Sequence, residues 1–202
     1  MFSDRVIVAG LFAVGLAVVG GFALSQSAVA QDVVDGPGPN LVIEVAGSVT
    51  GTVVIDMASD VAPNHVAQIT QLAKDGAYDG VVFHRVIDGF MAQTGDVEFG
   101  RQGGDLSMAG MGGSAMPDLA AEFSSMPFDR GVVGMARSMN PNSANSQFFI
   151  MFAPAPHLDG QYTVVGHVVS GMDVVDAIKK GDQAANGAVD APDYMASVTV
   201  IE

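Results

Sequence analysis

One segment of the chain places a charged group among apolar neighbours in a way that indicates binding chemistry. Arg85 stands inside the apolar run Val82–Ile87, and Phe90, Met91 and Gln93 follow closely. A guanidinium among apolar side chains requires a partner or a task, because burial of an unpaired charge is costly. Its five N–H groups can only donate, and it keeps its proton near neutral pH. The segment therefore predicts a fixed hydrogen-bond donor beside an apolar surface.

The sequence lacks the residues that several other kinds of chemistry require. The 202-residue chain has no Cys, which removes thiol nucleophiles, disulfides and thiolate metal ligands. Its 4 His are scattered without an i, i+4 pair, so no metal site is predicted and no cofactor is expected. No Gly-x-Ser-x-Gly element indicates a hydrolase. The Gly-rich stretch 110–113 lacks the Lys-Ser/Thr that completes a phosphate-binding loop.

Composition favours one folded, acidic domain. Apolar residues make up 49% of the chain, and the length is sufficient for a real core. The 22 acidic residues outnumber the 8 basic ones and give a net charge of −14. Because binding to a phosphate backbone needs basic patches, no nucleic-acid partner is expected.

The N-terminus has the layout of an export signal. Arg5 precedes an apolar run over Val6–Leu24, and the small-residue site Ala28-Val29-Ala30 follows. Cleavage after Ala30 would give a signal peptide over residues 1–30 and an exported, periplasmic protein. Without cleavage, the same run would anchor the chain in the inner membrane, which would be its only membrane contact. Both interpretations stay open.

The elements that must position Arg85 are mostly strands. After a linker at 31–40, the domain over 41–202 contains β-rich runs separated by turn residues. The runs predicted as strands cover residues 41–46, 50–57, 81–87, 91–94, 121–123, 132–136, 147–152, 164–169 and 198–201. The first two read as a hairpin. Two helices are predicted, one beginning near Pro63 and ending at Gly76, the other over Met172–Lys180. This pattern predicts a closed or nearly closed antiparallel β-barrel capped by two helices.

The first helix carries further local expectations. Pro63 suits its first turn, and Asp60 is expected to help cap it. Val66, Ile69, Leu72 and Ala73 recur at helical spacing and should face inward, whereas His65 should lie on the surface.

Three motifs together resemble the cyclophilin family of peptidyl-prolyl isomerases. Phe83–Asp96 reads FHRVIxGFMxQxGD, Ser146–Ile150 reads SQFFI, and Leu158–Gln161 reads LDGQ. The resemblance covers Leu41 to the C-terminus. It implies a mainly β fold, a closed eight-stranded antiparallel β-barrel capped by two α-helices. It also implies an enzyme that accelerates X–Pro isomerisation. Together with the export signal, this predicts an action on folding proteins of the cell envelope. The implied partners are proline-containing polypeptides; we expect a monomer.

The resemblance assigns roles to eleven residues. Arg85 falls on the catalytic arginine, and Gln93 would hold it in place or bond a substrate carbonyl. The apolar pocket for the Pro ring falls on Phe90, Met91, Phe149 and Leu158. The other substrate-binding positions are Ala136, Arg137, Gln147, His157 and Tyr162.

Physical chemistry agrees with these assignments. Isomerising a peptide bond breaks no covalent bond, so it needs no nucleophile, base or metal. The barrier of roughly 18–20 kcal/mol comes from amide resonance. A catalyst must favour the twisted amide, in which the prolyl nitrogen gains a lone pair that a fixed guanidinium can bond.

Two alternatives stay open. The same groove could hold proline-containing clients as a binding or chaperone module without useful turnover. Arg85 could instead be a structural arginine paired with Asp96 or Glu98. The acidic piece from Asp182 to Asp193 is interpreted as a solvated loop.

Two departures from the usual family pattern yield a prediction. His157 stands where the family has Trp or Phe, and Tyr162 stands where many members have His. The first position supports cyclosporin binding in the family, so we expect weak inhibition by cyclosporin. A sub-micromolar inhibition constant in an isomerase assay would contradict this expectation.

Overall fold

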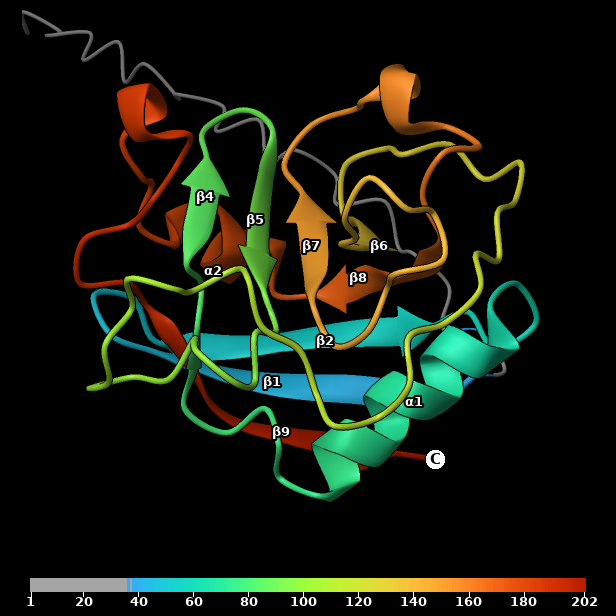
Figure 1. The fold of residues 1–202 in the computed structure, drawn as a ribbon, viewed down its shortest axis with the longest axis horizontal. Coiled ribbons are helices and arrows are strands. Elements are labelled where there is room, and N and C mark those ends of the chain that lie inside the picture. The colour runs from blue at the N-terminus through green and yellow to red at the C-terminus, as the bar shows by residue number, and fades with distance from the viewer. Residues whose placement is uncertain (1–35, 37) are drawn as a thin grey trace, which may run out of the picture. The chain divides into compact units, whose positions relative to one another are not determined.

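The computed structural model describes Gly36 and residues 38–202 (Figure 1). The predicted signal peptide or anchor at 1–30 lies outside the described residues, as does most of the linker. Within the described part, no helix is both long and apolar enough to cross a membrane.

Nine strands form one sheet in which every pairing is antiparallel. The strands are β1 (Asn40–Ala46), β2 (Gly51–Met57), β3 (Val81–Val82), β4 (Arg85–Ile87), β5 (Met91–Thr94), β6 (Val132–Met135), β7 (Phe148–Met151), β8 (Val164–Ser170) and β9 (Tyr194–Ile201). The helices of the described part are α1 (Pro63–Lys74) and α2 (Met172–Ala177), with short 3₁₀ turns η1 (Pro156–Leu158) and η2 (Gln183–Ala185).

The sheet order corrects one expectation. The mainly β class with two helices is confirmed, but the closed eight-stranded barrel is not. The order is β3-β9-β1-β2-β8-β6-β7-β5-β4, which leaves β3 and β4 as the two ends. The predicted strand 81–87 is split, because Val81 and Val82 pair with β9 whereas Arg85–Ile87 pair with β5. Only Phe83 and His84 lie between them, so the covalent chain joins the two ends of the sheet.

The curled sheet surrounds the main core. In Figure 1, β4, β5 and β7 run upright while β1, β2 and β9 run across. The predicted hairpin of β1 and β2 is confirmed, and β9 pairs with the other edge of β1. Helix α1 packs against β9 and α2 against β2. Strand residues at alternate positions, such as Leu41, Ile43 and Val45, fill the core from β1.

The start of α1 differs from the expectation. Pro63 is in the first turn and Val66, Ile69, Leu72 and Ala73 are buried, as predicted. Asp60 does not cap the helix; the N-cap position is Ala62 and has no side-chain bond. His65 is fully buried rather than on the surface.

Glu122 explains both differences at α1. Its carboxylate accepts the backbone N–H groups of Asn64 and His65 at 3.2 and 3.1 Å, and the His65 ring nitrogen Nδ1 lies 2.6 Å away. A carboxylate from another segment therefore performs the work of an N-cap and also provides the buried histidine with a partner. The predicted strand 121–123 does not form, because Glu122 turns toward α1 instead of entering a ladder.

We expect Glu122→Ala to lower the free energy of unfolding by about 2–4 kcal/mol. The change removes the acceptor for two helix N–H groups and leaves His65 buried without its partner. Urea unfolding followed by circular dichroism measures the loss. Glu44→Ala is the control, since among the described residues the exposed Glu44 carboxylate bonds only the Thr52 hydroxyl. Equal stability of the two variants would contradict the prediction.

Candidate functional site

Arg85 begins the edge strand β4, and three hydrogen bonds hold its guanidinium. Nη1 donates to Gln93 Oε1 at 3.2 Å. Nε donates to the main-chain oxygen of Asn186 and Nη2 to its Oδ1, each at 3.0 Å. Partial burial lowers the pKa of the Arg85 guanidinium, which nevertheless stays protonated near neutral pH. The side chain is thus a charged donor with a fixed orientation.

A chain of hydrogen bonds supports Gln93 from the other side. Gln93 Nε2 donates to Gln147 Oε1 at 3.0 Å, and Gln147 Nε2 donates to the Gly112 carbonyl at 2.8 Å. Gln93 lies opposite Arg85 in the β4–β5 ladder, so its amide reaches the guanidinium directly. Gln147 comes just before β7, the strand next to β5.

The Asp96 carboxylate fixes the segment that carries Gly112. It accepts four backbone N–H groups, those of Glu98, Phe99, Gly110 and Gly112, at 2.7–3.1 Å. Burial alone would raise the pKa of Asp96, but these four donors together hold it below its usual value. A Cβ on Gly112 would lie 2.5 Å from Asp96 Oδ1, so only glycine fits there. The amides of the Gly-rich stretch therefore do bind an anion, and this anion is the Asp96 carboxylate of the same chain.

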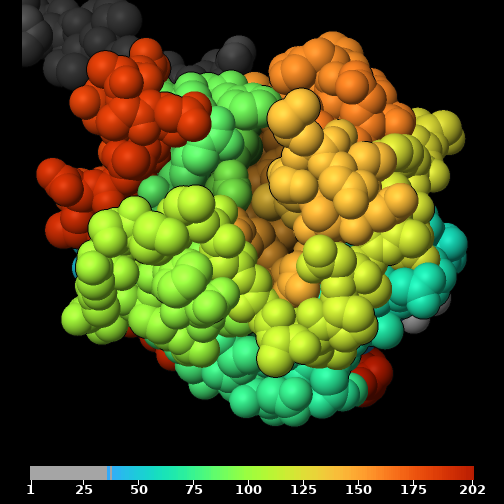
Figure 2. Space-filling model, in the orientation of Figure 1, coloured from blue at the N-terminus to red at the C-terminus, as the bar shows by residue number. Residues whose placement is uncertain are grey.

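Beside Arg85 lies a cavity of about 360 Å³ with an apolar floor. Met91, Phe149 and Leu158 line it and are almost fully buried, while Phe90 is half-buried at its rim. Phe149 stacks on Phe128 with ring centroids 5.8 Å apart, which fixes the floor from below. Figure 2 shows the molecule hollowed between the segment around β4 and β5 and the segment around β7.

The far wall of the cavity is aromatic and carries a positive charge. His157 is exposed and stacks on Phe90, with centroids 5.8 Å apart. The Tyr162 ring meets Phe149 edge-on at 5.9 Å, and the Arg137 guanidinium lies 4.3 Å from the centroid of the Tyr162 ring. Arg137 also donates to the Gln161 carbonyl, so Tyr162 is held between a cation and the pocket floor.

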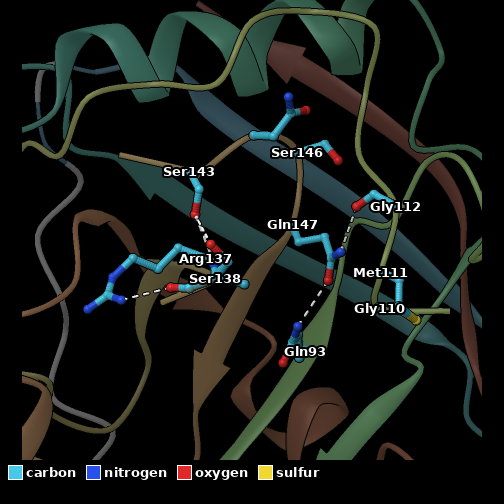
Figure 3. Close-up of a pocket in the computed structure, with 11 residues that line it drawn as sticks. Gln93, Gly110, Met111, Gly112, Arg137, Ser138, Ser143, Ser146 and Gln147 are labelled. Atoms are coloured by element: carbon cyan, nitrogen blue, oxygen red, sulfur yellow. Dashed lines mark hydrogen bonds between the residues drawn. The ribbon is translucent and has the colours of Figure 1, made fainter. Parts of the chain in front are cut away.

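A second cavity of about 280 Å³ continues the groove past Gln93 (Figure 3). It shares Gln93, Ala136 and Arg137 with the first cavity. The other residues of its wall are Gly110, Met111, Gly112, Ser138, Ser143, Asn145, Ser146 and Gln147. The Ala136 amide donates to the Gln147 carbonyl at 2.9 Å, which holds the wall together.

The structure brings the eleven predicted residues into one groove. Ten of them line the first cavity, and Gln147 lines the second. The alternative that Arg85 pairs with Asp96 or Glu98 is wrong, because Arg85 bonds Gln93 and Asn186 while Asp96 bonds backbone amides. Sequence reasoning missed Asn186 and treated its segment as a solvated loop. The Asn186-Gly187 pair, which favours a left-handed turn, was the available signal.

Comparisons with known proteins agree with this geometry. Residues 41–200 match the family described as cyclophilin type peptidyl-prolyl cis-trans isomerase/CLD. A probable peptidyl-prolyl cis-trans isomerase of Brucella suis is 64% identical over 152 residues, which cover 74% of this chain and 78% of the relative. The chain belongs to the cyclophilin-type peptidyl-prolyl isomerases, a family of enzymes that carry out isomerisation without a covalent step.

Solved structures agree on the fold. A cyclophilin from Hirschia baltica matches with a TM-score of 0.65 and 27% identity, over 79% of this chain and 73% of that one. A cyclophilin-type isomerase from Cryptosporidium parvum, solved in the presence of the dipeptide Ala-Pro, has a TM-score of 0.67 and 22% identity. That match covers 81% of this chain and 99% of the other.

His84 yields a pH-dependent prediction. Burial lowers the pKa of His84 from 6.5 to about 4, although the nearby Asp96 carboxylate raises it. Between these values the unfolded chain binds a proton that the native chain does not. The titration of His84 therefore does not change the free energy of unfolding above pH 6.5. It lowers this free energy progressively as the pH falls from 6.5 toward about 4. The loss is on the order of 3 kcal/mol.

Urea unfolding at a series of pH values tests this prediction. His84→Phe keeps an aromatic ring but cannot titrate, so its stability should fall less steeply across the same window. The comparison uses the slopes, because the substitution also changes packing against Gly110. Parallel slopes for the two proteins would contradict the assignment to His84.

Proposed function

We propose that the protein accelerates cis–trans isomerisation of X–Pro bonds in folding proteins of the cell envelope, with Arg85 as the catalytic donor. The observation that carries this proposal is the 360 Å³ cavity in which one held guanidinium borders an apolar floor. The Ala-Pro dipeptide named for the Cryptosporidium structure supports a proline-containing ligand for this groove.

The geometry supports catalysis by stabilisation of a twisted amide. Met91, Phe149 and Leu158 would grip the Pro ring while the rest of the peptide rotates about the X–Pro bond. At the twist the prolyl nitrogen loses resonance and gains a lone pair, and Arg85 can donate to it. A planar amide nitrogen offers no such acceptor, so the hydrogen bond favours the transition state over both ground states. The fixed position of Arg85 means that little reorganisation is needed during the rotation.

The use of such an enzyme is kinetic. Uncatalysed X–Pro isomerisation takes tens of seconds or more and limits the folding of many chains. The groove continues into a second cavity with serine and amide side chains in its wall, which gives an extended client a place for residues outside the Pro ring. We therefore expect broad tolerance of the residue before Pro.

Arg85→Ala tests the catalytic assignment. Removing one preorganised donor should lower the rate of catalysed exchange by about 10²–10³-fold. The measurement is exchange NMR on a short X–Pro peptide at equilibrium. Arg130→Ala is the matched control, because Arg130 pairs with Asp176 and lines neither cavity of the groove. Wild-type exchange rates in Arg85→Ala would remove Arg85 from the mechanism.

The same assay distinguishes catalysis from holding. The second cavity, with its serine and amide lining, could bind a peptide without helping rotation, so a holding module is the second candidate. A holder would shift peptide resonances on binding but leave the exchange rate at its uncatalysed value. That result in the wild-type protein would replace the proposed enzyme by a binding module.

Export is a separate proposal and has its own test. The basic start, the apolar run Val6–Leu24 and the small-residue site at Ala30 support a cleaved signal peptide. We expect Gln31 as the first residue of the mature protein when the full chain is produced in a bacterial host and its N-terminus is sequenced. A mature protein that retains residues 1–30 would favour the membrane-anchored form instead.

A further inference from the structure

Asn186 accepts two of the three hydrogen bonds that orient Arg85, from a position 101 residues away in the chain. It is exposed, and it lines neither of the two cavities of the groove. In the described part of the chain, the Asn186 side chain bonds no group other than Arg85. The side-chain contact is therefore made with Arg85 alone, by a residue outside the lining of the groove.

We propose that Asn186 is a positioning residue that aims Arg85 at the prolyl nitrogen; this inference rests on the proposed isomerase function. The two contacts of Asn186 take one edge of the guanidinium, from Nε to Nη2. Gln93 takes Nη1. A guanidinium has five N–H groups, so one N–H on each terminal nitrogen remains for the substrate.

Gln93 alone would not fix this orientation. A single hydrogen bond at Nη1 is a pivot about which the guanidinium plane can swing. Two acceptors on the Nε–Nη2 edge stop that motion, because a planar fork matched by two oxygens has one geometry. Asn186 thus fixes the orientation of the Arg85 guanidinium plane, whereas Gln93 provides a third hydrogen bond to it.

The loop that carries Asn186 is built onto the free edge of β4. Gly181 N donates to the Val86 carbonyl at 2.9 Å, and Val86 N donates to the Gly187 carbonyl at 2.8 Å. Val189 N donates to the His84 carbonyl at 3.2 Å, on the other side of Arg85 in the chain. In Figure 1 this loop, with its short η2 turn, lies next to β4. The arginine and its partner are therefore fixed to each other through the backbone.

Local geometry explains why an asparagine stands at this position. Asn186 has φ 55° and ψ 33°, in the left-handed region that asparagine and glycine tolerate best. This conformation lets the main-chain oxygen and the side-chain oxygen of one residue reach the same guanidinium. Gly187 follows with φ 81°, and a Cβ there would lie 2.5 Å from the Ile87 side chain.

Three variants test the proposal. Asn186→Gly keeps the left-handed backbone and its carbonyl but removes Oδ1. Asn186→Asp keeps an oxygen at the same place. Gln183→Ala is the matched control, an exposed residue of the same turn for which no side-chain hydrogen bond links it to Arg85. Exchange NMR at several peptide concentrations gives kcat and KM for each, and urea unfolding gives stability.

We expect Asn186→Gly to lower kcat about 10-fold, since a hydrogen bond to a charged group is lost and the donor is no longer aimed. KM should stay near the wild-type value, because Asn186 lines neither cavity of the groove. Asn186→Asp should restore most of kcat, and Gln183→Ala should leave it unchanged. An unchanged kcat in Asn186→Gly, or a loss that Asn186→Asp does not rescue, would overturn the proposal.

A direct view of Arg85 separates this proposal from the proposed function. The ¹⁵Nε–H resonance of Arg85 should broaden or shift toward that of a freely rotating guanidinium in Asn186→Gly but not in Gln183→Ala. This readout needs no turnover. A wild-type protein without catalysis would refute the isomerase, whereas an Arg85 resonance unaffected by Asn186→Gly would refute the positioning role on its own.

Discussion

Four backbone amides converge on the Asp96 carboxylate, and the shape of the groove follows from that convergence. The long irregular segment after β5 has no ladder of its own, so its backbone donors need another acceptor. Asp96 supplies that acceptor and places the Gly112 carbonyl where Gln147 can reach it. Gln147 then holds Gln93, and Gln93 holds Arg85. A buried carboxylate that lines neither cavity of the groove therefore sets one side of Arg85, the donor of the proposed mechanism.

The two sides of Arg85 are held by different parts of the chain. Gln93 is its direct cross-strand neighbour in the β4–β5 pair, so the strand register creates that contact. Asn186 comes from a loop near the C-terminus that covers the free edge of β4. An edge strand such as β4 needs such a cover, because exposed ladder groups invite unwanted pairing. Here the covering segment also supplies acceptors for the guanidinium.

The sequence predicted the contacts that arise within a periodic run or a short motif. The apolar runs identified the hairpin of β1 and β2 and the buried face of α1, because their periodicity reports which side chains face inward. The grouping of Phe90, Met91 and Phe149 came from the family resemblance. Contacts made by the polar atoms of one distant residue gave no periodic signal. Glu122 as the cap of α1 and Asn186 on Arg85 are of this kind, and both were missed. The split of 81–87 was also hidden, since both halves have strand composition and only the pairing partners differ.

The pairing of β1 with β9 has a consequence for the order in which the chain can fold during its synthesis. Asn40 lies opposite Ile201, so the first strand of the sheet and the last are neighbours in its interior. A ribosome synthesises β1 long before β9, and translocation with the N-terminus leading would impose the same order. Until β9 arrives, β1 has one open edge and β3 lacks its partner strand. The Asn186 loop also emerges late, so Arg85 acquires these partners only after the 101 residues that separate it from Asn186 have been made. An enzyme proposed to assist the folding of other proteins thus completes its own sheet only when β9 has been synthesised.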